Sequence, residues 1–125
     1  MSRRPARRVF GPGPHDLLCD RRRVAAVAVA ETTRTRRKGL LGSDQVEGGL
    51  WITRCPSVHM IGMRYAIDVA VLDRDGLVLA VKTLQPWTGG TSFRRGAVAT
   101  LEAPVGALAE WGLVPGVQLT VRRRA

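Results

Sequence analysis

The sequence predicts a mainly β domain, either a compact antiparallel β-sandwich or a small barrel, with one or two short helices. Short apolar runs recur along the chain and are separated by turn signals, as in sandwiches and small barrels. These runs do not alternate with long helical segments, so a parallel βαβ sheet is not expected. Apolar residues make up 45% of the chain, which is enough to form a core. The expected strands cover residues 24–31, 50–53, 66–73, 77–83, 97–103 and 117–121.

The clearest local structure is a hairpin formed by residues 66–73 and 77–83. Asp75-Gly76 lies between the two runs and is a strong signal for a tight hairpin turn. Successive side chains of the first strand are predicted to alternate between the two faces of the sheet.

Two short helical segments are expected between the strands. Thr32 or Thr33 can cap a helix over 33–41, because a threonine hydroxyl accepts a hydrogen bond from the first turn. Gly42 is a plausible stop for that helix. The second helical turn is expected over 105–111.

The positive charge lies mostly at the two ends of the chain. The net charge is +10, of which residues 1–23 carry +5 and residues 122–125 carry +3. We therefore predict a basic irregular leader over 1–23, a single domain over 24–121 and a basic tail over 122–125. Within the leader, the short apolar patch Leu17-Leu18-Cys19 could pair at a sheet edge. Solvated ends are the simplest interpretation. The alternative is a tether that holds nucleic acid or an anionic membrane weakly.

Cysteine content and hydropathy favour a cytoplasmic protein without a transmembrane segment. Cys19 and Cys55 are too few for a disulfide scaffold and suit a reducing compartment. No apolar run approaches the ~20 residues of a membrane span. The apolar residues 24–30 are at the lower limit for a signal peptide core and are better explained as a strand.

Several short motifs follow one another within residues 24–121. They are Arg37-Lys38-Gly39-Leu40-Leu41-Gly42, Gly48-Gly49-Leu50-Trp51, Val58-His59-Met60, Ala66-Ile67-Asp68-Val69-Ala70-Val71-Leu72-Asp73, Asp75-Gly76 and Val98-Ala99-Thr100-Leu101-Glu102-Ala103. This order resembles DUF192, a family of domains of unknown function. The resemblance implies a compact β-domain and supplies no reaction. The family usually has Phe-Trp-Met followed by Asn-Thr, where this chain has Val58-His59-Met60 and Gly62-Met63.

Four residues are candidates for ligand binding: His59, Arg64, Asp68 and Trp87. Asp68 interrupts an apolar strand, and a buried carboxylate is costly unless it is paired or hydrogen-bonded. In a structural role, Asp68 would accept N–H groups from the irregular segment 57–65. In a functional role, it would line a pocket with Arg64 or His59 as its charge partner.

His59 and Trp87 each have two interpretations. His59 is either an ordinary surface or core histidine, or a pocket residue that acts as a ligand or general base. Trp87 lies between Pro86 and the flexible Gly89-Gly90. Its ring could bind a sugar or a peptide, or it could cover the core as a lid.

Histidine and cysteine form two spaced pairs, His15-x₃-Cys19 and Cys55-x₃-His59. Four such residues could bind zinc in principle, but zinc sites usually pair like residues at short spacing. Pro56 argues against a helix at the second pair, and on a strand four residues span about 13 Å. We predict neither a metal nor a cofactor.

Three functions are considered. The first is a non-enzymatic binding or accessory module that contacts an unknown small molecule or protein through segments 55–65 and 85–95. The second is a small enzyme using Cys55 or His59 with Asp68, which are the residue types of a nucleophile, its base and an orienting group. The third is a protein tethered to a polyanion by its arginine-rich ends. No complete catalytic motif is present, which favours the first.

Overall fold

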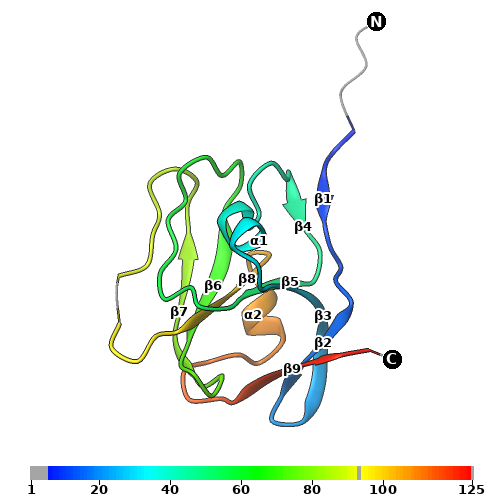
Figure 1. The fold of residues 1–125 in the computed structure, drawn as a ribbon, viewed down its shortest axis with the longest axis vertical. Helices are drawn as coiled ribbons and strands as arrows, with labels where there is room; N and C mark the ends of the chain where they lie inside the picture. Colours follow the sequence, from blue (N-terminus) through cyan, green and yellow to red (C-terminus); the bar gives the residue numbers. More distant parts are fainter. Residues whose placement is uncertain (1–5, 93, 125) are drawn as a thin grey trace, which may run out of the picture.

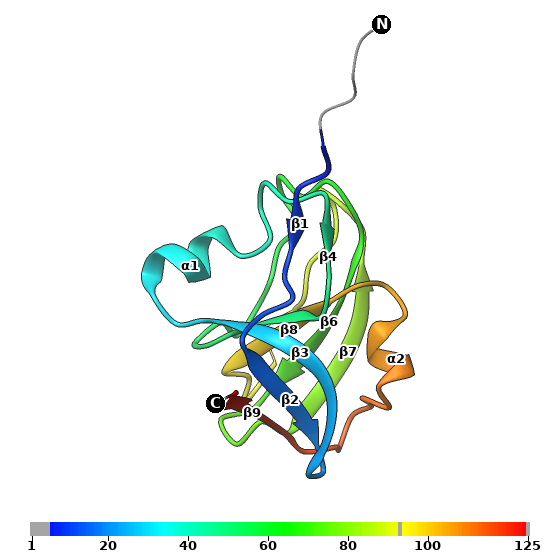
Figure 2. The same ribbon diagram turned by 90° about the vertical axis from the view of Figure 1, so that its right-hand side faces the viewer.

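The computed structural model describes residues 6–92 and 94–124. In this part of the chain, two short helices lie on opposite sides of a curved β-sheet (Figure 1 and Figure 2). The strands are β1 (Val9–Phe10), β2 (His15–Cys19), β3 (Arg22–Ala30), β4 (Gln45–Val46), β5 (Gly49–Ile52), β6 (Ile67–Leu72), β7 (Val78–Leu84), β8 (Ala99–Ala103) and β9 (Leu119–Arg123). The helices are α1 (Thr33–Lys38) and α2 (Ala107–Glu110).

The main sheet has seven strands in the order β7-β6-β8-β5-β3-β2-β9, and β1 and β4 form a separate parallel pair. Neighbours in the main sheet pair antiparallel, except for β3 and β5, which run parallel. The mainly β class with two short helices is confirmed, but the sheet is mixed. The parallel pair arises because segment 31–48, which includes α1, is long enough to return the chain before β5 begins.

The two edge strands of the main sheet approach each other at one end. Leu77 and Gln118 form an isolated bridge there, and the Leu119 N–H donates to the Gly76 carbonyl oxygen at 2.9 Å. Among the described residues the strands do not close into a barrel, so the sheet is curled and open. Apolar side chains fill its inner side. The completely buried ones are Leu17, Val27, Ala70, Leu72, Leu101, Ala103 and Leu108.

The outer face of the sheet carries a second apolar cluster beneath α1 and the long connection between β5 and β6. Met60, Ile67 and Val69 are completely buried in it. Ala70 and Leu72 belong instead to the inner cluster. β6 therefore sends alternate residues to two apolar environments, which confirms the predicted alternation and explains why the whole strand is buried.

Helix α1 begins at a capping box. The Thr32 hydroxyl accepts from the Thr35 N–H at 3.1 Å, and the Thr35 hydroxyl accepts from the Thr32 N–H at 3.1 Å. The helix ends at Lys38, earlier than expected, because Gly39 rather than Gly42 takes the positive φ of 49° at the cap. None of the α1 side chains is buried. In the described parts of the chain, neither helix has the length and apolar character to cross a membrane.

The sheet extends into both ends for which the sequence predicted irregular structure. β2 lies within residues 1–23 and pairs with both β3 and β9, and its Leu17 is completely buried. The arginines at 21–23 obscure this strand in the sequence, because they are exposed and follow it closely, at the turn and at the start of β3. β9 likewise continues to Arg123, within the expected tail.

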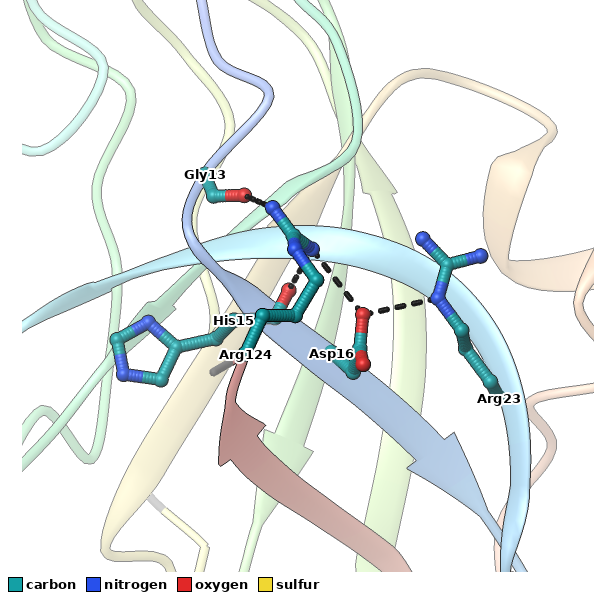
Figure 3. Close-up of polar contacts among 5 residues, drawn as sticks. All are labelled: Gly13, His15, Asp16, Arg23 and Arg124. Atoms are coloured by element: carbon teal, nitrogen blue, oxygen red, sulfur yellow. Dashed lines mark hydrogen bonds and ion pairs between the residues drawn. The ribbon is translucent and has the colours of Figure 1, made fainter.

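Asp16 connects the two ends of the described chain (Figure 3). Its Oδ1 accepts from Arg23 Nε at 2.8 Å and from Arg124 Nη1 at 3.1 Å. Arg124 also donates to the carbonyl oxygens of Gly13 at 2.5 Å and His15 at 3.0 Å. The hydrogen bonds from the two guanidinium groups lower the pKa of Asp16. Two arginines of the basic ends are therefore engaged within the fold.

Removing either side of this contact is expected to lower the melting temperature. Because Asp16 and Arg124 interact, the Asp16→Asn, Arg124→Ala double variant should lose less than the sum of the single losses. The lowered pKa means that the carboxylate stabilises the fold above pH 3.8 and that this contribution disappears as the pH falls through the folded-state pKa. Thermal unfolding at neutral and acidic pH measures both effects. The exposed Arg123→Ala is the control, and additive losses would contradict the contact.

Candidate functional site

Asp68 lies on β6 beside the start of α2. Its Oδ1 accepts from the Thr83 hydroxyl at 2.5 Å, and its Oδ2 accepts from the Gly106 N–H at 2.8 Å. Gly106 is the N-cap residue of α2 and has a φ of 90°, which suits glycine. The carboxylate therefore holds the turn before α2 against the sheet. It does not bond to segment 57–65, which was the partner expected from the sequence.

The segments that contain His59 and Trp87 are joined by backbone hydrogen bonds. The Trp87 N–H donates to the Met60 carbonyl oxygen at 2.8 Å, and the Met60 N–H donates to that of Gly89 at 3.0 Å. His59 forms an isolated antiparallel bridge with Gly90. The two loops expected to share one contact surface therefore lie side by side.

The outer parts of these loops expose both apolar and polar groups. Trp87 is 64% exposed and Ile61 is 59% exposed. Arg64 is also exposed, and its Nη1 donates to Asp44 Oδ1 at 2.9 Å. The structure therefore places His59 and Trp87 together, pairs Arg64 with Asp44, and leaves Asp68 apart from all three.

A cavity of about 110 Å³ lies between α1 and the outer face of the sheet. One side is formed by the last turn of α1, with the basic side chains of Arg36, Arg37 and Lys38. Apolar wall residues such as Leu40 come from the turn after the helix, and Glu102 lines the cavity from β8. The cavity thus combines three cations, an apolar wall and one acidic group.

Glu102 is the most unusual group in this cavity. Its side chain is only 5% exposed, and it faces the same side of the sheet as its ladder partners Leu50 and Val69. Burial raises the pKa of Glu102 from 4.5 to about 7. No hydrogen bond from the described residues reaches its carboxyl group, and its oxygens are not among the side-chain atoms sealed from solvent, so they face the open cavity. A mostly buried acid with a raised pKa that lines a cavity is a marker of a functional site.

Cys55 and His59 line the same cavity. The Cys55 thiol donates to the Ser57 carbonyl oxygen at 3.3 Å. Burial, and secondarily the charge of Glu102, raise the pKa of Cys55, so the sulfur is held as a thiol rather than a nucleophilic thiolate. Asp68 does not join them, because it pairs with the residue next to Glu102 on β8 and so faces the opposite side of the sheet.

The four residues considered as zinc ligands are also separated. His15 and Cys19 lie on β2, and Cys19 packs into the inner cluster. Cys55 and His59 line the cavity on the outer face. Within residues 6–92 and 94–124, no three His, Cys, Asp or Glu side chains are arranged to hold a metal ion.

Glu102 is missing from the residues predicted from the sequence, although a signal for it is present. Glu102 is the one charged residue in the expected strand 97–103. Asp68 likewise interrupts an apolar stretch of its own expected strand. The same argument about a buried carboxylate would have selected it. Its position in a cavity depends on α1, whose packing over β8 has no local sequence signal.

The fold and the site together define a mainly β domain with a small cavity on the outer face of its sheet. Residues 18–121 match the DUF192 family, which is described as an uncharacterized ACR. The chain therefore belongs to this family, as the resemblance predicted. No curated protein matches the chain.

Two solved structures share the fold. A protein of unknown function from Novosphingobium aromaticivorans is 20% identical, with a TM-score of 0.70 over 86% of this chain and 83% of that one. A candidate transcription regulator from Sinorhizobium meliloti is 18% identical, with a TM-score of 0.66 over 86% of this chain and 93% of that one. At these identities the similarity establishes the architecture only.

Proposed function

We propose that this protein is a non-enzymatic binding module and that its ligand occupies the cavity beneath α1. The observation that carries the proposal is the buried Glu102 carboxyl group, which faces the cavity and accepts no hydrogen bond from the described residues. A ligand that completed this bonding would offset the cost of burying the group. The exposed loops with His59 and Trp87 lie around the same side of the domain and would form the outer part of the contact surface.

The enzyme hypothesis has less support. Asp68 is occupied by Thr83 and Gly106 on the other face of the sheet, so it is not available to orient His59. The thiol of Cys55 has a raised pKa, whereas nucleophilic cysteines usually have a lowered one.

The tether hypothesis has no specific contact in its favour, and Arg23 and Arg124 already pair with Asp16. Binding to DNA or anionic lipid that survived removal of residues 1–23 and 122–125 would exclude a tail mechanism. Such truncations also remove β2, so this test requires proof that the truncated chain folds. Cys19 and Cys55 are unpaired, which supports the expected cytoplasmic location.

A thermal-shift screen of a small-molecule fragment library tests the binding proposal. Fragments that bind the cavity should raise the melting temperature of the parent protein. At a fragment concentration about a hundred times Kd, the free energy of unfolding should increase by about 3 kcal/mol. Glu102→Gln should lose this shift. Glu110→Gln is the matched control, because Glu110 is exposed on α2, across the sheet from the cavity. A shift that survives in Glu102→Gln, or a screen without hits, would contradict the proposal.

A further inference from the structure

Two polar side chains of opposite charge line the cavity and lack a hydrogen-bond partner among the described residues. One is the carboxyl group of Glu102 on β8, which is 5% exposed. The other is the half-buried guanidinium group of Arg36 on α1, whose Nε–H is sealed from solvent and has no hydrogen-bond partner among the described residues. The two side chains do not form an ion pair with each other, unlike the three pairs found elsewhere in the described chain. The cavity therefore presents a carboxylate acceptor on one side and a guanidinium donor on another, and a ligand can pair with each separately.

The surroundings of these groups restrict the ligand further. Leu40, Ile52 and Met63 provide apolar wall in the same cavity. Arg37 and Lys38 add positive charge on the side of Arg36. A simple anion would be repelled by the carboxylate of Glu102. A simple cation would be repelled by the three basic side chains that line the cavity. A volume of about 110 Å³ admits only a small molecule, with room for several water-sized groups.

We propose that the cavity binds a small aliphatic zwitterion of the α-amino acid class, with its ammonium group at Glu102 and its carboxylate at Arg36. This inference rests on the proposed binding function and names its ligand class. The ammonium donates to the Glu102 carboxylate, the ligand carboxylate accepts from the guanidinium group of Arg36, and the aliphatic side chain lies against the apolar wall. Each side chain thereby gains a charged hydrogen bond, which is stronger than a neutral one.

Binding should depend on pH, because an ammonium group requires Glu102 in its ionised form. With a pKa of about 7 in the free protein, ligand binding releases a proton from Glu102 below that pH. The affinity should rise about a hundredfold between about pH 5 and pH 8 and then level off. The titratable and charged groups facing Glu102 or lining its cavity are Arg36, Arg37, Lys38, Cys55, His59 and Tyr65. The variant His59→Gln, measured over the same pH range, tests whether Glu102 alone accounts for the pH dependence.

Isothermal titration calorimetry of the full chain with L-valine tests this assignment, with isobutylamine and isovalerate as the single-charge analogues. Valine should bind at least tenfold more tightly than either analogue. Glu102→Gln should weaken valine and isobutylamine at least tenfold, while Arg36→Met should weaken valine and isovalerate. Arg34→Met is the matched control, because Arg34 is an exposed residue of α1 outside the cavity. Circular dichroism establishes that each variant is folded.

The outcomes separate this inference from the function on which it rests. If fragments bind in a Glu102-dependent manner but valine binds no better than its analogues, the amino acid assignment is wrong and the binding function stands. Affinity that falls with rising pH would likewise overturn the ammonium assignment, since it indicates a ligand that needs the protonated acid. If neither fragments nor valine bind, both proposals fail.

Discussion

Replacing Glu102 with glutamine is expected to make the protein more stable at neutral and alkaline pH. Burial raises the pKa of Glu102 from 4.5 to about 7 in the folded protein. Between these values the folded state keeps a proton that the unfolded chain has released, so the free energy of unfolding falls as the pH rises. The loss is absent below pH 4.5 and complete above pH 7, where it amounts to about 3 kcal/mol.

Urea unfolding of the parent and the variant across this range measures the effect. The free energy of unfolding of Glu102→Gln, relative to the parent, should increase by about 3 kcal/mol between pH 4.5 and pH values above 7. Glu110→Gln should follow the parent throughout, because that side chain is exposed. Parallel curves for Glu102→Gln and the parent would mean that the carboxyl group is solvated, and both proposals would then lose their basis.

Asp68→Ala is expected to destabilise the fold by about 3 kcal/mol at neutral pH. The substitution removes the acceptor for the Thr83 hydroxyl and for the Gly106 N–H, and both bonds are made to a charged group that is 7% exposed. It therefore leaves two donors near the start of α2 without their partner. Chemical denaturation of the parent and the variant at one pH gives the difference.

Asp68→Asn is the informative comparison, because the amide keeps one acceptor oxygen and can donate to the Thr83 hydroxyl. It should cost about 1 kcal/mol, and Thr83→Val should cost a similar amount. None of these changes should affect ligand binding in the cavity, which lies on the other face of the sheet. A loss of valine binding in folded Asp68→Asn would show that the two faces are coupled.

The hairpin and the larger strands could be predicted because their signals are local. β6 and β7 pair from Ile67 with Leu84 to Leu72 with Val78, around the turn that Asp75-Gly76 indicates. The parallel pairing of β3 and β5 could not be derived, because strand direction depends on the path of the intervening chain. The apolar patch Leu17-Leu18-Cys19 indicated a strand at a sheet edge, but the run of arginines that follows obscured the extent of β2 and the complete burial of Leu17.

The candidate site was only partly predictable for a similar reason. A carboxylate in an apolar strand does require compensation, and Asp68 receives it, but its partner Gly106 is 38 residues away in the sequence. The loops that carry His59 and Trp87 were correctly expected to be neighbours. The cavity itself depends on a short helix from one part of the chain covering a glutamate from another, and no local pattern encodes that packing.

The two sides of the cavity, formed by strand β8 and by helix α1, differ in how firmly the fold holds them. β8 is hydrogen-bonded between β5 and β6, whereas α1 buries none of its side chains and is fixed at its start by a threonine pair. Segments with few buried contacts open locally at a small free-energy cost, while central strands open only with the whole domain. A local opening of α1 would therefore let a ligand enter or leave the cavity without disruption of the sheet. Substitutions at the capping threonines of α1, which leave Arg36 in place, are therefore expected to change how long a ligand stays in the cavity, while Glu102 on β8 keeps the same chemistry.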